Sequence, residues 1–549
     1  MIEESATIPI PCAVFHRRES CVSLRSGDSA PSRGVWTYES ESRDASLFGS
    51  GPNIRKLADA GLVLLIAYVA FSSVFRAAAK YFGSDEIIAV GLVRLPSVSA
   101  IWGALENSAD SHPPPFYVVE RVASRLPINE LIAFRVPSIL AFCGLILCVF
   151  LFIRKSRGST CALVCATIPL LSVLFYPYAV EARGYSLMAG FAALAMVSYQ
   201  RANRKAWCVL LGVSLTAATA SHYYGVFAAF PFALAELALL AKDRRLRPNV
   251  WLALLLSVLP VALFWHLLQL YKSTYGTNFV GHLSTAEVLR SYGFLWNLRP
   301  LPGIGLAAAA LVAILRFGFS HRKEALPNSP DHVPLQEHVL ALGFIILPVV
   351  MGLAFKVLHA GFLYRYTIMA VLSFPLAASY VLSALDQRLG VVFSILLLAS
   401  LGAQEAGFRD PYWFPIKAAS TESVERLVKS AGHDDLPVVV SDPNTYLQLA
   451  YYSSPEENRR MVYVADPPSA LTYLGSGNGD QCMLALRPYL AVQVERFPNF
   501  VGIHREFLIY VDASDIWGWV QTRMLNDGYA LDVVAMDHER RVYLVHRKS

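Results

Sequence analysis

Two neighbouring carboxylates, Asp85 and Glu86, are the first residues in the sequence that could carry out acid–base chemistry. One carboxylate can take a proton as a general base while the other supplies a negative charge or a metal ligand. As an isolated dipeptide, the pair is also compatible with two solvated acids in a loop.

A second group combines an acid and an imidazole with a rigid backbone. Asp110 and His112 precede Pro113, Pro114 and Pro115. Proline fixes its own φ and favours an extended conformation in the residue before it. The segment is therefore either a strut that aims both side chains at a site or a simple loop that leads into a helix.

A third group is Glu-Ala-Arg-Gly-Tyr, which contains Glu181, Arg183 and Tyr185. Arginine can donate two or more hydrogen bonds to the oxygens of a phosphate group. Alternatively, Arg183 pairs with Glu181 and extends toward the membrane interface. The sequence leaves both interpretations open.

Two further groups are rich in tyrosine. His222 and Tyr223 stand in Ser-His-Tyr-Tyr-Gly, and Arg365 stands between two tyrosines, shortly after Lys356 and His359. These residues could bring an imidazole and positive charge to one site. Aromatic and basic side chains are also typical interfacial anchors, so this alternative stays open as well.

The elements that must position these groups are membrane-spanning helices. Of the 549 residues, 55% are hydrophobic and only 16% are charged, and the mean hydropathy is +0.43. This composition is too apolar for a soluble globular protein. We predict about eleven spans, near residues 57–78, 131–153, 161–178, 184–199, 206–221, 223–241, 250–272, 301–317, 338–356, 366–384 and 389–404.

Basic residues between the spans predict the orientation, because lysine and arginine near span ends are retained on the cytoplasmic side. They cluster in alternate connections, at residues 154–157, 201–205, 242–247 and 316–323. The pattern predicts a multi-pass protein with a cytoplasmic N-terminus and an outer C-terminus. On this topology, all five groups face the outer side.

The segments on either side of the spans differ in composition. Residues 1–54 are rich in Ser, Arg and Glu, which predicts a disordered cytoplasmic tail. Residues 55–405 form the predicted membrane domain, and residues 406–549 are expected to form a separate outer α/β domain. In that domain we expect strands at 437–441, 461–465 and 507–511, helices at 445–452 and 514–525, and a hairpin over 531–545.

Several classes of chemistry have no visible binding motif in the sequence. It contains no zinc-type spacing of Cys or His, no P-loop and no Gly-rich dinucleotide motif. The net charge of +6 is small for this length and does not favour nucleic acid as a partner. A divalent metal ion that bridges an acid and a phosphate is compatible with these residues but not required by them.

In combination, the groups resemble the C-type membrane glycosyltransferases. The resemblance covers residues 57–405 and rests on the acid pair after the first span, Asp-x-His-Pro-Pro-x-x-Tyr, Arg135-Val-Pro-Ser138, Glu-Ala-Arg-x-Tyr and His-Tyr-Tyr-Gly, in that order. The sequence is most similar to bacterial relatives of the protein O-mannosyltransferases and of the lipid A aminoarabinose transferase. Two positions depart from the pattern: Gly184, where the family more often has proline, and Pro115, where it has an aliphatic residue.

The resemblance implies an inverting glycosyltransferase. Such an enzyme moves one sugar, a hexose or a pentose, from a polyprenyl-phosphate donor to a glycan, lipid or protein acceptor on the outer side of a bacterial inner membrane. Asp85 matches the catalytic base, and Arg183, Arg365 and His222 are the candidates that stabilise the departing phosphate. The residues expected to orient the base or the sugar are Glu86, Asp110, His112, Glu181, Tyr185 and Tyr223.

Other functions share parts of this pattern. A lipid or solute transporter, or a flippase, would have a similar number of spans, but transporters usually place ionisable residues near the membrane midplane. A polymerase or ligase of lipid-linked glycans would use the same donor chemistry, and a polymerase would elongate its product. A purely structural role, with the outer domain as an interaction module, is a further alternative.

Overall fold

The computed structural model describes residues 52–172, 175–276, 285–295, 333–358, 362–384, 395, 399, 402, 418–512, 515 and 518–547. The span expected at 301–317 lies outside the described residues. The same holds for almost all of the tail expected at 1–54, and for the span expected at 389–404 apart from three single residues.

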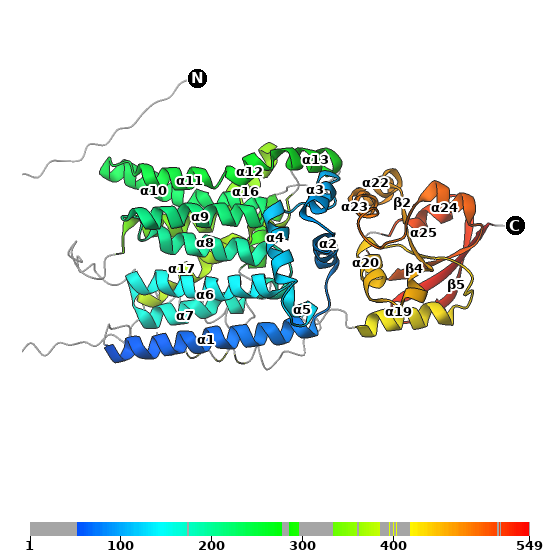
Figure 1. Cartoon of the computed structure of the whole chain (residues 1–549), viewed down its shortest axis with the longest axis horizontal. Coiled ribbons are helices and arrows are strands. Elements are labelled where there is room, and N and C mark those ends of the chain that lie inside the picture. Colours follow the sequence, from blue (N-terminus) through cyan, green and yellow to red (C-terminus); the bar gives the residue numbers. More distant parts are fainter. Residues whose placement is uncertain are drawn as a thin grey trace, which may run out of the picture. The chain divides into compact units, whose positions relative to one another are not determined.

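The helical part begins with α1 (Pro52–Ala79), which runs along the bundle in Figure 1. Four short helices then gather at one end of that bundle: α2 (Ser84–Val93), α3 (Val98–Glu106), α4 (Pro114–Ala123) and α5 (Glu130–Ala133). The connection predicted between the first two spans is therefore a helical cap, and it carries the first two chemical groups of the sequence.

The remaining helices of this part follow the predicted windows. They are α6 (Val136–Arg157), α7 (Ser159–Leu171), η1 (Tyr176–Val180), α8 (Tyr185–Tyr199), α9 (Lys205–Ser221), η2 (Tyr223–Ala228), α10 (Ala229–Asp243), α11 (Pro248–Leu256), α12 (Leu259–Leu263), α13 (Trp265–Tyr275), α14 (Thr285–Leu295), α16 (Leu335–Leu358), η3 (Tyr364–Leu372) and α17 (Ser373–Ala384).

Within the described ranges, five helical segments are long and apolar enough to cross a membrane. A sixth is counted if the pair 248–263 and 265–275, which is bent by 58°, forms one span. Three predicted spans correspond to shorter apolar helices, namely α7, α8 and α9. Helices are therefore found where the spans were expected, but several are shorter or more broken than a simple window predicts.

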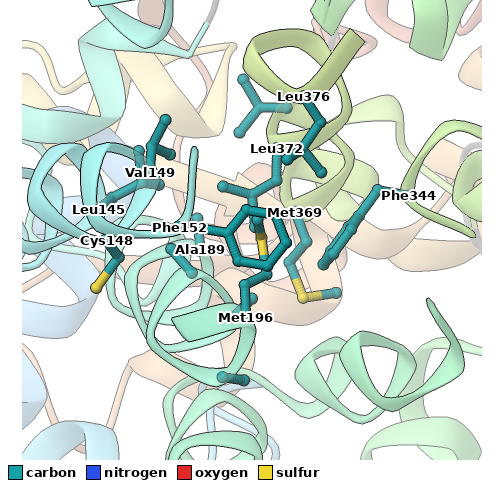
Figure 2. Packing of buried hydrophobic residues seen from close by; sticks show 14 of the residues in the cluster. Leu145, Cys148, Val149, Phe152, Ala189, Met196, Phe344, Met369, Leu372 and Leu376 are labelled. Carbon is teal, nitrogen blue, oxygen red and sulfur yellow. The ribbon is translucent and has the colours of Figure 1, made fainter. Parts of the chain in front are cut away.

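The core of the helical part lies between α6, α8, α16, η3 and α17. Figure 2 shows apolar side chains of these elements meeting, with Phe152 and Met196 opposite Phe344 and Met369. The side chains of neighbouring helices interdigitate along such a face. This packing fixes the ends of the helices, and the candidate site is built on those ends.

The C-terminal part contains a six-stranded sheet of order β3-β2-β1-β4-β6-β5. β1 lies between β2 and β4, parallel to both, and β6 joins β4 and β5 antiparallel. Its elements are α19 (Ala418–Ser430), β1 (Val438–Val440), α20 (Pro443–Tyr452), α21 (Pro455–Asn458), β2 (Met461–Ala465), α22 (Pro467–Leu474), α23 (Asn478–Leu486), β3 (Val494–Arg496), α24 (Phe497–Ile503), β4 (Phe507–Asp512), α25 (Val520–Asn526), β5 (Tyr529–Met536) and β6 (Arg540–Arg547).

The predicted start of the helix at 514–525 is wrong. The structure starts α25 at Val520, and Asp515 is not helical. The Asp515 carboxylate accepts hydrogen bonds from the Asp512 backbone N–H (3.0 Å) and from the Thr445 hydroxyl (3.1 Å). An aspartate that bonds nearby backbone stabilises a turn in competition with a helix. The other expected strands, the helix near 445–452 and the hairpin are confirmed.

Candidate active site

A buried ion pair between Glu86 and Arg135 holds the site together; we call it the brace. Arg135 is fully buried, and its Nε and Nη2 groups donate to the two carboxylate oxygens of Glu86, each at 2.9 Å. Glu86 also accepts hydrogen bonds from the backbone N–H groups of Gly83 (2.9 Å) and Ala182 (2.8 Å). Burial alone would raise the pKa of Glu86, but Arg135 and Lys80 bring it to about 2.

The brace joins three segments that are far apart in the sequence. Arg135 additionally donates to the carbonyls of Ala77 (2.8 Å), Lys80 (2.6 Å) and Tyr81 (3.0 Å), at the end of α1, where a cation interacts favourably with unpaired helix carbonyls. We expected Glu86 to orient substrate. In the structure its oxygens bind Arg135 and the backbone N–H groups of Gly83 and Ala182, and through Arg135 they link α2 and the connection before α8 to the end of α1.

A second ion pair links Asp110 and Arg183. The Nη1 and Nη2 groups of Arg183 donate to the Asp110 carboxylate at 2.7 and 3.2 Å, and Tyr117 donates its hydroxyl to the same carboxylate at 2.8 Å. Burial alone would raise the pKa of Asp110, but the charge of Arg183 and the interactions with His112 together outweigh burial and hold the pKa well below its usual value. Asp110 is therefore a fixed anion, and Arg183 reaches the site with part of its charge neutralised.

Asp85 and Arg365 form a third pair, which is open to solvent. Arg365 Nη1 donates to Asp85 Oδ2 at 3.1 Å, and the two side chains are 34% and 42% exposed. Arg183 Nη1 also donates to the backbone carbonyl of Asp85 at 3.1 Å. Within the described part of the chain, no hydrogen-bond partner is found for the buried Nε of Arg365. This pair therefore has both access and unused donor capacity.

Two buried histidines lie beside these pairs. The rings of His112 and His222 are 4.9 Å apart and nearly perpendicular. Burial and the charge of Arg183 lower the pKa of His112, and burial together with His112 and Arg183 lowers that of His222 further. Both imidazoles are therefore neutral near pH 7. His222 Nδ1 accepts the backbone N–H of Tyr224 (3.3 Å), so its proton is on Nε2.

Aromatic rings enclose His222. Tyr185, Tyr224 and Tyr366 place their ring centres 5.2, 5.0 and 5.9 Å from that of His222. Tyr223, the other tyrosine of the sequence motif, is buried, and its hydroxyl contacts no hydrogen-bonding group among the residues that the structure describes. Tyr185 therefore joins the wall of the site, together with Tyr366, which the sequence placed only as a neighbour of Arg365.

Glu181 lies at the edge of the cluster. Its carboxylate is 26% exposed and is 3.5 Å from the Lys80 ammonium group. Burial raises the pKa of Glu181, and Lys80 opposes that shift. Ser138 fixes the adjacent backbone by donating its hydroxyl to the carbonyls of Glu181 (2.6 Å) and Arg183 (3.2 Å). The pairing between Glu181 and Arg183 that the sequence allowed is replaced by the Asp110–Arg183 pair.

Gly184 is where the end of α9 meets the start of α8. A Cβ atom on this residue would lie 2.2 Å from the Ser221 carbonyl oxygen and 3.3 Å from the His112 ring. Any side chain there would overlap backbone, so the glycine is required for Arg183 and His222 to lie in one cluster. The departure from the family pattern thus has a steric reason in this chain.

The proline segment is extended and leads into a helix. Pro113 is extended, with φ −63° and ψ 145°, and α4 begins directly at Pro114. The first turn of α4 places Phe116 against His112, with ring centres 4.7 Å apart. The expectation that the segment leads into a helix is therefore confirmed, and the aim of Asp110 and His112 at a site stays a prediction.

Sequence reasoning missed two residues near the cluster. Glu120 on α4 is fully buried, and no hydrogen-bond partner for its carboxylate is found within the described ranges. Burial, reinforced by Glu86, raises its pKa well above the usual value. Burial and the charges of Asp110 and Asp85 raise the pKa of the Cys482 thiol, on α23, to about 12. An isolated Glu among valines and a lone Cys carry no signal in a sequence.

Of two further expected contributors, the structure describes one, and it lies outside the cluster. Lys356 is exposed at the end of α16, and His359 lies outside the described residues. As for a metal ion, the described parts of the chain contain no group of three or more His, Cys, Asp or Glu side chains that could hold one. Asp85 and Asp110 are each paired with an arginine instead.

The chain is similar to known proteins in sequence and in fold. The family model of dolichyl-phosphate-mannose-protein mannosyltransferase matches residues 111–265, which include His112, Arg183 and His222. The structure of ArnT from Cupriavidus metallidurans in the apo state superposes with a TM-score of 0.55 at 13% identity, covering 89% of this chain and 98% of that one. No curated protein matches the sequence.

Two further solved structures are similar at lower scores. ArnT from Cupriavidus metallidurans bound to undecaprenyl phosphate gives a TM-score of 0.49 at 14% identity, covering 88% of this chain and 98% of that one. The Archaeoglobus fulgidus oligosaccharyltransferase complex with Zn and sulfate gives 0.46 at 12% identity, covering 87% and 73%. The family model over residues 111–265 and the fold shared with the apo ArnT structure support the resemblance drawn from the sequence.

Proposed function

We propose that the protein is an inverting glycosyltransferase that moves one sugar from a polyprenyl-phosphate donor to an acceptor on the outer side of the membrane. The observation that carries the proposal is the solvent-accessible Asp85–Arg365 pair, beside Arg183 and His222 at one end of the bundle. The matched family model, whose description names dolichyl-phosphate mannose, supports a lipid-phosphate donor.

The reaction needs a base and a stabilised leaving group. The acceptor hydroxyl oxygen forms a bond to the anomeric carbon, and its proton passes to the Asp85 carboxylate. The bond between that carbon and the phosphate oxygen breaks from the opposite face, so the anomeric configuration inverts. The polyprenyl phosphate departs with the electron pair, and because it leaves as an anion it requires positive charge rather than a proton donor.

Arg365 is suited to exchange partners during this reaction. In the structure its guanidinium is shared with Asp85, and a donor phosphate at the same position would compete for it. Donor binding would then release Asp85 to accept a proton. The Nε group of Arg183 is buried, and no hydrogen-bond partner for it is found in the described part of the chain, so it offers a further donor.

Neutral and aromatic residues complete the proposed site. His222 can donate its Nε2 proton to a phosphate or sugar oxygen without adding charge. Asp110 and His112 position Arg183 and the ring of His222, and Tyr185 and Tyr366 present faces against which a sugar can pack. None of the proposed steps requires a metal ion.

The orientation and the outer part belong to the same proposal. The alternating basic clusters support a cytoplasmic tail over 1–54, a membrane domain over 55–405 and a periplasmic domain over 406–549 in a bacterial inner membrane. Contacts between the two parts, such as the hydrogen bond from the Phe82 N–H to the Tyr452 hydroxyl (2.6 Å), support a role for the C-terminal domain at the acceptor entrance.

The test uses the purified full-length chain and polyprenyl-phosphate sugars. Mass spectrometry of copurified lipid should find a polyprenyl-phosphate sugar, and incubation with candidate acceptors should give one added sugar of inverted anomeric configuration together with polyprenyl phosphate. Products with several added sugars would indicate a polymerase. Movement of intact donor between leaflets, without cleavage, would indicate a flippase and contradict the proposal.

A further inference from the structure

A pair of basic cavities lies at the end of the bundle opposite the candidate active site. Arg135 of the brace lies at the beginning of α6, whereas Arg154 and Lys155 lie in its last turn. A helix of this length separates its ends by roughly 30 Å. The first cavity has a volume of about 380 Å³ and the second about 360 Å³.

The first cavity is lined by four cationic side chains. Arg55 comes from α1, Arg154 and Lys155 from α6, and Arg201 from the connection after α8. No carboxylate is among its lining residues, which all belong to the described ranges. The nearby Asp59 pairs with Arg154 at 2.6 Å and so compensates one of the four charges.

A helix N-terminus adds to this positive potential. Gly158 has a φ of +84°, which lets α7 begin directly after α6 ends, and α7 has no side-chain cap at its start. Gly158 and Ser159 line the first cavity. The positive end of the helix dipole favours an anion at this position.

The second cavity adjoins the first and shares Lys155 and Arg201 with it. It adds Arg204 as a fifth cation, together with Gln200, Asn203 and Trp207. The shared cations are held in place: Lys155 donates to the Gln200 carbonyl (2.8 Å), and Arg201 donates to the Val197 carbonyl (2.9 Å) with its guanidinium over the Trp207 ring. Two adjoining anion pockets with common cations fit two linked anionic groups.

An apolar surface continues from the first cavity. Leu151 lines the cavity, and Leu147, one turn earlier on the same face of α6, is 37% exposed. A soluble anion would gain nothing from these leucines, whereas acyl chains would cover them.

We propose that the two cavities bind the headgroup of an anionic phospholipid that carries two phosphate groups, from the leaflet opposite the active site. The phosphates occupy the two cavities, with Lys155 and Arg201 between them, and the acyl chains lie along α6. This lipid site is separate from the donor site and does not depend on the proposed activity.

The experiment compares lipids and variants on the full-length protein in detergent. Native mass spectrometry and thermal unfolding are measured after addition of diphosphatidylglycerol, phosphatidylglycerol, phosphatidylcholine or inorganic pyrophosphate. The wild type should retain and be stabilised by diphosphatidylglycerol most strongly. The double variant Lys155→Gln/Arg201→Gln should bind it at least about tenfold more weakly.

A matched control removes two exposed basic residues of the same bundle end, in Lys242→Gln/Arg245→Gln, and should bind as the wild type does. If the double variant unfolds before lipid is added, the single variant Arg204→Gln takes its place and should show a weaker loss. Equal loss in the control would reduce the effect to general surface charge and overturn the proposal. Pyrophosphate that binds as well as the lipid would assign the cavities to a soluble anion, with the same consequence.

Discussion

Two ion pairs built from adjacent carboxylates differ in almost every physical respect. Glu86 in the brace is buried, contacts Arg135 through two hydrogen bonds and accepts two backbone N–H groups. Asp85, the preceding residue, is 42% exposed and meets Arg365 through one contact at 3.1 Å. The hydrogen-bonding positions of the Glu86 carboxylate are occupied, whereas the Asp85–Arg365 pair is accessible to a ligand.

The two neighbouring carboxylates are therefore suited to different tasks. Breaking a fully satisfied buried pair leaves an uncompensated charge, so the brace is suited to fix geometry and poorly suited to change during a reaction. An exposed pair costs little to open. Asp85 can therefore change partner and protonation state while Glu86 holds the surrounding segments still.

The largest effect is expected from Asp85→Asn. The amide cannot take the acceptor proton, so turnover should fall by about 10²- to 10⁴-fold while donor binding and folding persist. Transfer assays and donor-binding measurements on the purified variant check this. Asp527→Asn is the control, because Asp527 is also paired with an arginine, at 3.3 Å, and is 43% exposed. Unimpaired turnover in Asp85→Asn would remove the base assignment.

The brace is tested next, through stability. Glu86→Gln should destabilise the protein by about 3–5 kcal/mol, because Arg135 would keep a buried charge without its counter-ion. Thermal unfolding of the purified protein measures this, with Glu130→Gln as a control at an exposed pair of the same helical cap. The double variant Glu86→Gln/Arg135→Met should be more stable than the single one. A single variant as stable as wild type would show that the two pairs are alike.

Arg365→Ala should affect chemistry more than folding. Loss of the cation should lower turnover by about 10²- to 10³-fold and weaken donor binding. The free energy of unfolding should change by about 1 kcal/mol or less, since the pair is partly exposed. Arg94→Ala removes a comparable exposed arginine at the far end of α2 and should leave turnover unchanged. If both variants were equally active, the phosphate would have to bind elsewhere.

The smallest effect concerns pH. Because folding lowers the pKa values of His112 and His222, the unfolded chain binds more protons than the folded one below their usual pKa of 6.5. Stability should therefore be full above that pH and decline as the pH falls below it. Unfolding temperatures between pH 7.5 and 5 measure the slope, which should flatten in His112→Gln and persist in the surface variant His538→Gln. A steeper slope in His112→Gln would contradict the predicted lowering of the His112 pKa on folding.

The sequence predicted where the described helices of this part lie, because the length of an apolar run is set by the thickness of a bilayer, but it did not predict that several are shorter or bent. It also placed Asp85, Arg183 and His222 on one face through the alternation of basic residues. Partners could not be predicted in the same way. Asp85 and Arg365 are separated by 280 positions, and nothing in their spacing reports that they meet. The resemblance, not the spacing, suggested that they share a site.

Local competition explains the remaining misses. Glu86 and Asp85 are both carboxylates and look alike in the sequence. Their surroundings differ because α2 begins at Ser84 and successive side chains of a helix point in different directions. β3, with only Val494, Glu495 and Arg496, is too short to show alternation. The sequence pattern predicts Asp515 in the first turn of a helix, whereas its contacts with Asp512 and Thr445 place it in a turn.

The contact at Gly184 has a consequence for engineering. The residue has φ −67°, which proline would tolerate, yet its α-hydrogen faces the Ser221 oxygen where a ring carbon would collide. Proline at this position would therefore push the start of α8 and the end of α9 apart and carry the Arg183 guanidinium away from the His222 imidazole. A substitution of Gly184 would thus impair the chain unless the backbone around Ser221 is changed along with it.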